Sequence, residues 1–309
     1  MARHVDLRVR IGPLELPNPV IAASGTFGHG DEVARLCDPA QLGAVTAKSL
    51  APFEWPGHPG PRLHMTTGGM LNAVGLEGPG IEHWIDEDLP RLRAYDARVI
   101  ASLWGRTVDD FAVGAKMLQR ARDDLVAIEV NVSCPNLEDR SRMFAHAPNT
   151  TKAAVSAVAD AGLALPVLAK LSPNVVDLVD IASAAVEGGA TGLTLVNTLL
   201  GLLVDAEHRR PVLGGGGGGL SGPAIKPVAL RAVHDVTRAM PDVPVVGTGG
   251  VSDGTDAVEM MLAGATAIGV GTATFHDPRA PIRVVEGLRR WCARHRVARV
   301  VDLIGAMES

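Results

Sequence analysis

Short apolar runs alternate with longer amphipathic or alanine-rich segments along this chain, and that alternation restricts its fold more than any other feature. A strand followed by a helix, repeated many times, is typical of βα units whose strands pair in parallel. Eight units can be counted, with strands predicted over Val20 to Ala23, Ala44 to Ala47, Val99 to Leu103, Ala127 to Val132, Val167 to Leu171, Gly192 to Val196, Val243 to Val246 and Ala267 to Val270. Helices are predicted around residues 31–37, 80–94, 107–121, 149–162, 175–187, 224–239, 253–263 and 278–296. Eight βα units within 309 residues predict an α/β protein that forms a single (β/α)8 TIM barrel.

The residues ahead of the first unit alternate between apolar and polar types from Val5 to Ile11, turn at Gly12-Pro13 and continue to Leu16. This pattern predicts a β-hairpin, which we expect to close the bottom of the barrel. The whole chain, residues 1–309, is expected to form one domain.

Two long segments rich in proline or glycine, residues 52–62 and 205–222, follow predicted strands. Loops of that length in a compact domain are usually functional or mobile, and their position after strands assigns both to the catalytic face. The glycine run 214–219 is expected to be a flexible loop rather than an interdomain linker, because βα units continue beyond it.

Charge and cysteine content exclude several classes of protein. The formal net charge is −5 and no cluster of Lys and Arg is interleaved with aromatic residues, which argues against a nucleic-acid ligand. The first residues lack the apolar core of a signal peptide and no uncharged run is long enough to span a bilayer, so we expect a cytoplasmic protein. Three scattered cysteines without a C-x-x-C pair predict neither a disulfide framework nor a metal site. Any iron–sulfur cluster must therefore come from another chain.

The predicted fourth strand ends in a thiol, Cys134, with Asn131 and Asn136 on either side and Pro135 directly after it. Because proline cannot donate to a sheet ladder, the strand ends there and places Cys134 at the rim of the barrel. One interpretation is an ordinary buried cysteine, since free cysteines usually behave as small hydrophobes. The two carboxamides argue instead for a polar pocket around the thiol.

The carboxyl ends of barrel strands converge on one rim, so the residues at those ends form one candidate site. They are mostly hydroxyl, amide, lysine and glycine residues, namely Ser24, Lys48, Ser49, Ser102, Asn131, Cys134, Lys170, Val196, Asn197, Thr198, Gly249, Gly250, Gly271 and Thr272. The glycines after the seventh and eighth strands suit phosphate binding by main-chain N–H groups, and Gly249-Gly250 lie just before an expected helix start at Ser252-Asp253. Tight turns are the alternative explanation for these glycines.

Lys48 and Lys170 each end an apolar run, where an ammonium group is costly unless it has a partner. Beside a phosphate site at one barrel mouth, they suit an anionic ligand or a ring that becomes anionic during reaction. Four amides suit an amide-bearing, carboxylated small molecule, although each also suits the capping of a turn: Asn72, Asn131, Asn136 and Asn197. Asn72 is expected in a glycine-flanked loop that closes over such a ligand.

Several of these segments resemble class 1 dihydroorotate dehydrogenases, and the resemblance runs from the first predicted strand to the last. The matching segments are Asn18 to Val20, Ser24 to Gly28, Asn72 to Leu76, Asn131 to Asn136, Lys170 to Asn174, Asn197 to Leu199, Leu220 to Pro227, Gly249-Gly250 and Gly271-Thr272. These segments are most similar to those of the class 1B catalytic subunit. The resemblance implies a TIM barrel that holds one FMN and oxidises (S)-dihydroorotate to orotate in de novo pyrimidine (UMP) biosynthesis.

The resemblance also implies a role for each candidate residue. Cys134 is implied as the general base at C5 of dihydroorotate while hydride leaves C6 for FMN; Lys48 lies where flavin and substrate meet, and Lys170 stabilises the reduced ring. The implied FMN site comprises Ser24, Lys48, Ser49, Ser102, Asn131, Lys170, Val196, Gly222, Gly249, Gly250, Gly271 and Thr272. The implied substrate site comprises Lys48, Asn72, Ala73, Val74, Gly75, Leu76, Asn131, Asn136, Asn197 and Thr198. A thiol, with an ordinary pKa of about 8.5, is a tolerable base if its surroundings stabilise the thiolate.

Class 1B further implies a partner, an iron–sulfur flavoprotein subunit that carries FAD and a [2Fe–2S] cluster and passes electrons to NAD, around a homodimer core in a heterotetramer. Class 1A enzymes use fumarate and need no partner, and the sequence leaves the acceptor open. Ser102 occupies a position at which many relatives have Asn, and the shorter serine side chain reaches less far toward the flavin. The loop 137–148, with Arg140, Arg142 and His146, corresponds to a lid over substrate, and we take its charges to be solvated.

Two other functions fit part of the pattern. A dihydropyrimidine dehydrogenase-like reductase shares the flavin but does not need to bind a carboxylate. A non-redox barrel isomerase or aldolase would bind a sugar phosphate at the glycines and form a Schiff base on Lys170. Flavin absorbance separates the aldolase from both reductases, and a comparison of dihydroorotate with dihydrouracil as reductant separates the two reductases.

Overall fold

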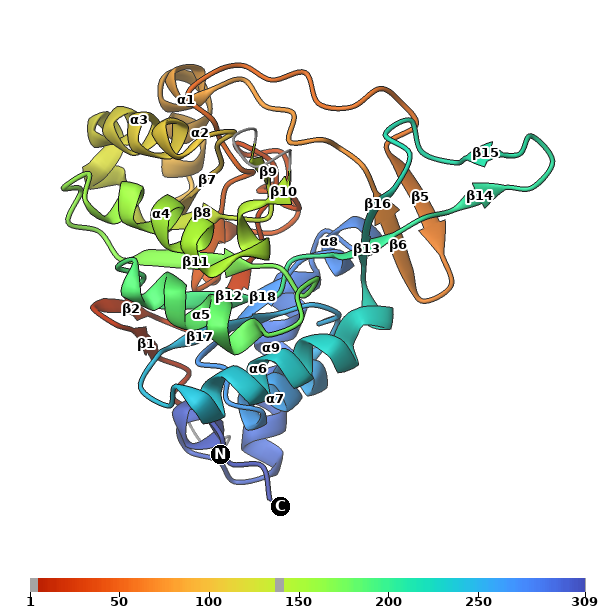
Figure 1. The fold of residues 1–309 in the computed structure, drawn as a ribbon. Helices are drawn as coiled ribbons and strands as arrows, with labels where there is room; N and C mark the ends of the chain where they lie inside the picture. Colours follow the sequence, from red (N-terminus) through yellow and green to blue (C-terminus); the bar gives the residue numbers. More distant parts are fainter. Residues whose placement is uncertain (1–4, 137–141, 309) are drawn as a thin grey trace.

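The computed structural model describes residues 5–136 and 142–308 (Figure 1). Parallel strands close into a barrel in the order in which they occur along the chain, and the last of them pairs with the first. They are β3 (Val20–Ala22), β4 (Ala44–Thr46), β7 (Val99–Leu103), β8 (Leu125–Asn131), β11 (Val167–Leu171), β12 (Gly192–Leu195), β17 (Val245–Thr248) and β18 (Ala267–Val270). The predicted TIM barrel is thus confirmed, with the seventh strand two residues later than expected.

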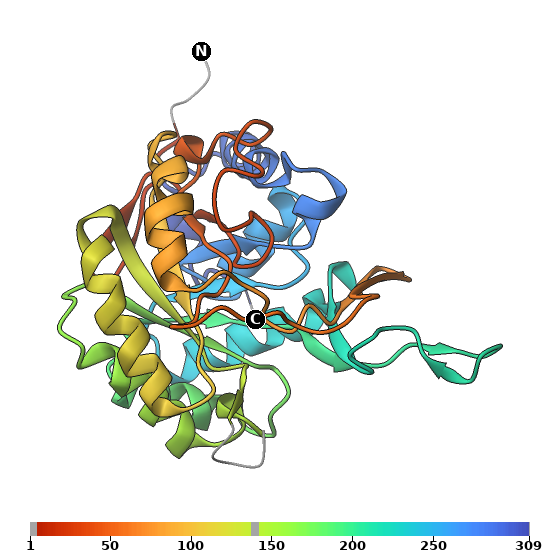
Figure 2. The same cartoon turned by 90° about the horizontal axis from the view of Figure 1, so that it is seen from above.

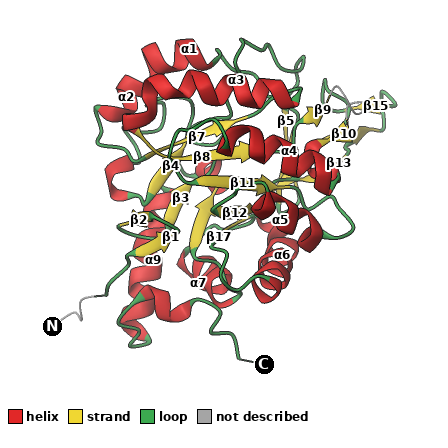
Figure 3. Cartoon of the chain, turned by 60° about the vertical axis from the view of Figure 1, so that its left-hand side comes forward, coloured by secondary structure: helices red, strands yellow, loops and turns green. Residues whose placement is uncertain are grey.

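Helices surround the strands on the outside of the barrel (Figure 3). They are α1 (Ile81–His83), α2 (Leu89–Arg93), α3 (Val108–Leu118), α4 (Pro148–Ala159), α5 (Leu178–Glu187), α6 (Lys226–Ala239), α7 (Gly254–Leu262), α8 (Ala273–His276) and α9 (Ala280–Arg294). A π-helical segment, η2 (Trp84–Asp88), joins α1 to α2. Short 3-10 turns are η1 (Pro39–Gln41), η3 (Gln119–Asp124), η5 (Phe144–His146), η6 (Pro223–Ile225) and η7 (Val300–Leu303).

The helix predicted at residues 31–37 is wrong, because this segment forms only turns. Its hydrogen bonds include Ala34 N–H to Asp31 O and Leu36 N–H to Val33 O, which span three residues and do not continue. Pro39 follows closely, and Asp38 before it has an extended backbone with ψ of 111°. Because a residue that precedes proline disfavours the helical conformation, the segment cannot extend into a regular helix.

The predicted hairpin is confirmed as β1 (Val9–Ile11) and β2 (Leu14–Leu16), which pair in antiparallel register. Ile11 is fully buried, and it packs against Gly192 at the start of β12. The hairpin therefore covers the amino ends of the strands, which form the bottom of the barrel.

A second sheet projects from one side of the barrel, and the end of the predicted long loop 205–222 forms one of its strands (Figures 1 and 2). Its strands, in spatial order, are β13 (Leu199–Gly201), β16 (Gly218–Ser221), β6 (Gly69–Asn72) and β5 (Leu63–Thr66). A thin ribbon of β14 (Val204–Asp205) and β15 (Arg210–Pro211) extends beyond it. The expected flexible loop at 214–219 is thus wrong in its second part, because Gly218 and Gly219 are paired in a strand. Asn72 likewise lies in a strand and not in a loop.

A continuous apolar core joins the barrel to its helices. Its largest fully buried aromatic members are Trp84, Trp104, Phe27, Phe111 and Phe144. The rings of Phe111 and Phe144 meet edge to face with centroids 5.3 Å apart, which ties α3 to the chain that follows Cys134. The end of β8 is therefore held from outside the barrel.

Candidate active site at the carboxyl end of the barrel

Side chains from five of the strand ends meet in one hydrogen-bonded network. Ser49 is at its centre, because its hydroxyl lies 3.3 Å from the hydroxyl of Ser24 and 2.9 Å from that of Ser102. Asn131 Nδ2 donates to Ser49 Oγ at 3.1 Å, and Asn197 Nδ2 donates to Asn131 Oδ1 at 3.4 Å. The structure thus brings together residues that lie between positions 24 and 197 of the sequence, as the rim argument predicted.

Glu129 is part of this interior, and the sequence prediction missed it. Its carboxylate lies 3.8 Å from Lys170 Nζ and accepts hydrogen bonds from Ser102 Oγ at 3.3 Å and Thr194 Oγ1 at 3.1 Å. A signal was present in the sequence, because Glu129 interrupts an apolar strand two residues before Asn131 and so shares its face. The buried cation at Lys170 therefore has a buried anion beside it.

The Cys134 thiol is fully buried and donates to two main-chain oxygens, Gly105 O and Asn131 O, each at 3.1 Å. Burial raises the pKa of the Cys134 thiol to about 12, although main-chain groups of Gly105 and of Cys134 itself oppose the shift. This contradicts the expectation that the surroundings stabilise the thiolate, because the low-dielectric interior disfavours the charged form. In this conformation Cys134 is a neutral hydrogen-bond donor.

Lys48 lies between Ala47, whose carbonyl accepts from Ser24 Oγ at 2.9 Å, and Ser49. Burial lowers the pKa of the Lys48 ammonium, and the carboxylates of Glu77 and Glu32 oppose that shift. Burial, together with the charge of Lys48, also lowers the pKa of His29 to about 4, so this ring is neutral at physiological pH. The ammonium of Lys48 is thus a positive charge that this side of the rim offers to an anionic ligand.

The projecting sheet carries Asn72 to the rim. Asn72 Nδ2 donates to Gly219 O at 3.1 Å across the pairing of β6 with β16. Thr198 lies against the same glycine, where a Cβ atom would come within 2.1 Å of the Thr198 hydroxyl. Asn174, which was not predicted as a site residue, donates to Thr198 O at 2.9 Å and so fixes the start of β13.

The segment from Ala73 to Leu76 is held by hydrogen bonds from the 52–62 insertion. Trp55 Nε1 donates to Gly75 O at 3.0 Å, and the main-chain N–H of His58 donates to Val74 O at 3.0 Å. Leu76 has a φ of 61°, an uncommon value for a residue with a side chain. The insertion therefore serves as a brace that shapes this part of the rim.

The glycines after β17 and β18 form a cradle with free donors. Among the described residues, no protein acceptor takes the main-chain N–H of Gly249, Gly250, Gly271 or Thr272. A Cβ on Gly250 would lie 2.6 Å from Lys226 Cβ, so a side chain there cannot be accommodated without movement. Within the described part of the chain, the buried hydroxyl of Thr274 also lacks a hydrogen-bond partner. This set of donors fits a phosphate group.

The start of α7 does not belong to that cradle, contrary to the prediction. Asp253 accepts from the N–H groups of Thr255 and Asp256, and Asp256 accepts from those of Ser252 and Asp253. Two carboxylates therefore occupy the end of the helix and would repel a phosphate. The free main-chain donors therefore come from the loops.

The structure places all but one of the remaining predicted residues. Val196 directly follows β12, and its N–H donates to Thr248 O at 2.8 Å. Gly222 has a φ of 96° and lies close to Gly69 and to the methyl group of Thr272. Asn136 lies in β9 (Pro135–Asn136), which pairs with β10 (Arg142–Met143). Arg140, in the predicted lid, lies outside the described residues, whereas His146 lies in η5.

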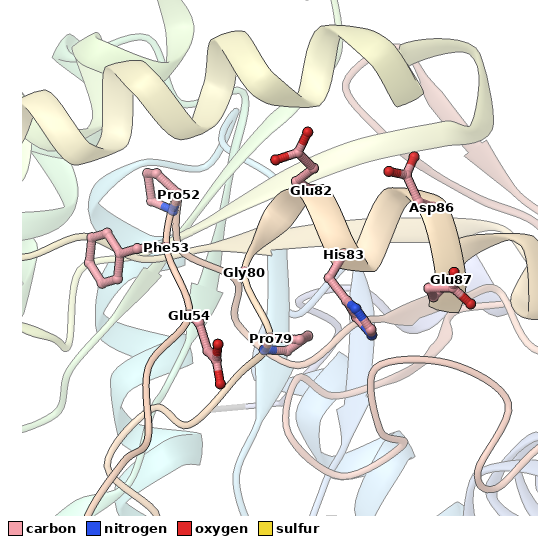
Figure 4. A pocket seen from close by; sticks show the side chains of 9 residues that line it. All are labelled: Pro52, Phe53, Glu54, Pro79, Gly80, Glu82, His83, Asp86 and Glu87. Atoms are coloured by element: carbon pink, nitrogen blue, oxygen red, sulfur yellow. The ribbon is translucent and has the colours of Figure 1, made fainter.

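Two surface hollows lie elsewhere on the molecule. One, of about 410 Å³, lies between Pro52–Glu54 and α1, and Glu82, His83, Asp86 and Glu87 line its acidic side (Figure 4). The other, of about 470 Å³, lies between the start of α7 and α9. Neither contains a predicted site residue. Within the described part of the chain, no group of three His, Cys, Asp or Glu side chains is arranged to hold a metal, and no helix has the length and apolar character to cross a bilayer.

The active sites of (β/α)8 enzymes lie at the carboxyl ends of the strands. A rim of amides, hydroxyls and lysines beside a phosphate cradle therefore defines this chain as a barrel enzyme with a phosphorylated ligand. Comparison with known proteins specifies it further. The family model described as dihydroorotate dehydrogenase matches residues 6–291. The chain belongs to the dihydroorotate dehydrogenase family.

Curated relatives resemble the chain over nearly its whole length. It is 45% identical over 303 residues to the "dihydroorotate dehydrogenase B (NAD(+)), catalytic subunit" of Alkaliphilus metalliredigens, which covers 98% of this chain and 99% of the relative. Proteins of the same description from Geotalea uraniireducens and Trichlorobacter lovleyi are 45% and 46% identical over 302 residues, with 98% of each chain covered. The similarity to class 1B found in the sequence is thus confirmed.

Proposed function

We propose that this chain is the catalytic subunit of an NAD-linked dihydroorotate dehydrogenase, an FMN enzyme that oxidises (S)-dihydroorotate to orotate in pyrimidine biosynthesis. One observation carries the proposal: the rim combines free phosphate donors, a buried lysine and linked amides within a chain that is 45% identical to such subunits. We extend the proposal to the whole chain, residues 1–309, as one FMN-binding domain of the cytoplasm.

The cofactor's phosphate would be held by the main-chain donors of Gly249, Gly250, Gly271 and Thr272. Ser24, Ser49, Ser102, Val196 and Gly222 would line the remainder of the cofactor site. FMN, when bound, supplies a hydride acceptor. Lys170 would face the part of the ring that gains negative charge, where a fixed cation stabilises the reduced form.

The substrate would be held by paired amide donors and acceptors. Asn131 and Asn197 are oriented by their mutual hydrogen bond of 3.4 Å, and Asn72 is oriented by its bond to Gly219 O. Together with Asn136, Thr198 and the braced segment 73–76, these groups would bind the ring edge of orotate. Lys48 would pair with the substrate carboxylate, which offsets the cost of its own burial.

Cys134 would remove the C5 proton as general base. The two carbonyl oxygens that contact its sulfur accept hydrogen bonds from the thiol and would repel a thiolate, so the resting geometry favours the neutral thiol. Proton removal therefore requires that bound substrate replace those contacts at the sulfur. Directly before Cys134 in the sequence lies Ser133, whose hydroxyl is buried without a hydrogen-bond partner among the described residues.

We also propose that the chain forms a homodimer to which an iron–sulfur flavoprotein subunit with FAD and a [2Fe–2S] cluster is added, giving a heterotetramer that reduces NAD. The projecting sheet and its ribbon expose aliphatic side chains, namely Leu63, Met65, Leu200, Leu202 and Val204. Exposed aliphatic side chains gathered on one projecting part of a protein are typical of an interface. Light scattering of the chain alone should give a dimer mass, and Met65→Lys should shift it toward a monomer. A wild-type monomer at micromolar concentration contradicts the assembly.

The alternative in which Lys170 forms a Schiff base is disfavoured by its contact with Glu129, because a paired ammonium is a poor nucleophile. The decisive experiment is anaerobic addition of reductants to the purified protein. We expect one FMN per chain, bleached by (S)-dihydroorotate and not by dihydrouracil. A colourless protein that takes up no FMN contradicts the proposal, and faster bleaching by dihydrouracil favours a dihydropyrimidine reductase.

A further inference from the structure

Glu129 is a buried carboxylate inside the barrel, and it has no role in the proposed reaction. Its side chain is 5% exposed, and that of its neighbour Lys170 is 9% exposed. A buried charge is costly unless it is paired and hydrogen-bonded, so the two charges stabilise one another in this interior.

The surroundings of Glu129 fix its carboxylate from three strands. Ser102 in β7 donates to Oε1 at 3.3 Å, Thr194 in β12 donates to Oε2 at 3.1 Å, and Lys170 in β11 lies 3.8 Å from Oε1. Of these three neighbours only Lys170 is charged. Both carboxylate oxygens are thus occupied, and the group has a defined orientation toward the lysine.

Lys170 is held differently. Among the described residues its Nζ has no hydrogen-bond acceptor, and Glu129 is its only ion partner. Lys170 is paired in register with Asn131, whereas Glu129 precedes Asn131 by two residues and so lies one layer deeper in the barrel. The ammonium therefore has its counter-charge on the side away from the rim and its N–H donors free.

We propose that Glu129 is a positioning residue that sets how much of the positive charge of Lys170 reaches the bound flavin, and thereby sets the flavin's reduction potential. The inference rests on the proposed FMN site. A carboxylate behind the ammonium cancels part of its field at the rim, so the reduced ring is stabilised less than by lysine alone. Glu129 therefore lowers the potential and makes the flavin a better donor to the next carrier.

The test is the midpoint potential of bound FMN, measured anaerobically at pH 7 by equilibration with redox dyes. Glu129→Gln should favour reduction by about tenfold, which corresponds to about 30 mV for a two-electron couple. The same substitution in a Lys170→Met background should change nothing. In that background the carboxylate has no ammonium whose field it can offset.

Two comparisons complete the test. Thr194→Val removes one hydrogen bond to Glu129 but keeps both charges, so it should leave the potential close to that of the wild type. If Glu129→Gln does not fold, Glu129→Asp keeps the charge, withdraws it by one methylene, and should raise the potential by a smaller amount.

The proposal is overturned if the Glu129 variants leave the potential unchanged or lower it, or if Glu129→Gln shifts it equally in both backgrounds. These outcomes are distinct from failure of the proposed function, in which the wild-type protein itself binds no FMN.

Discussion

Replacing Cys134 by serine should remove a loss of stability that the wild type suffers at alkaline pH. The thiol has a folded pKa of about 12 against an ordinary value of 9.0, because burial disfavours its charged form. In the unfolded chain it ionises near the ordinary value. The folded state alone therefore keeps the proton between these two pH values, and the resulting stabilisation is fully present below pH 9 and disappears as the pH rises toward 12.

The magnitude follows from the size of the shift. Each pH unit above the ordinary pKa costs about 1.4 kcal/mol, so between pH 8 and pH 10 the wild type should lose about 1.4 kcal/mol more than Cys134→Ser. Cys37 and Cys292 are present in both proteins, so their own ionisation cancels in the comparison. The assay is urea denaturation at both pH values with a reductant present. Equal losses in the two proteins would refute the reasoning, since the thiol would then ionise as readily in the fold as in the unfolded chain.

Three further predictions concern the rim. Gly250→Ala places a Cβ 2.6 Å from Lys226 Cβ at a φ of 79°, so it should cost about 1–3 kcal/mol in urea denaturation and reduce the FMN content per chain; unchanged FMN content contradicts the phosphate cradle. Asn72→Ala removes an amide that its bond to Gly219 O orients, so it should raise KM for dihydroorotate by about tenfold while FMN stays bound; an unchanged KM removes Asn72 from the substrate site. Because burial keeps Cys134 protonated, flavin reduction by dihydroorotate should accelerate by up to about tenfold per pH unit from pH 7 to pH 9 in stopped-flow experiments, and a plateau below pH 8 argues against a buried thiol as base.

The barrel was predictable because each of its strands is a local signal. Segments such as Val99–Leu103 and Val167–Leu171 are apolar except for Ser102 and Lys170 and are buried at every residue, as strands covered on both faces must be, and they were predicted to the residue. The convergence of Ser24, Ser49 and Asn131 followed from topology alone, since parallel strands deliver their carboxyl ends to one rim.

The projecting sheet was not predictable in the same way. Gly218 and Gly219 have a composition typical of a loop, and they form a strand because Asn72 and Leu199–Gly201 bring partners to them from distant parts of the chain. Glycine in that strand permits the close approach of Thr198, which no local pattern encodes.

The protonation of Cys134 also depends on tertiary structure. The thiol is neutral because it is fully buried, and it donates to Gly105 O from the neighbouring βα unit. Glu129 could have been recognised as a polar interruption of its strand, but its pairing with Lys170 depends on the parallel register of β8 and β11.

The central claim is that a flavin bound at this rim takes hydride from dihydroorotate while the Cys134 sulfur removes the proton. Single-turnover flavin reduction by (S)-dihydroorotate, in wild type and Cys134→Ser at pH 8, tests it most directly. We predict that the variant retains FMN and is reduced at least ~10²-fold more slowly, since a hydroxyl is a far weaker base than a thiolate. Equal rates in two fully loaded proteins would contradict the claim.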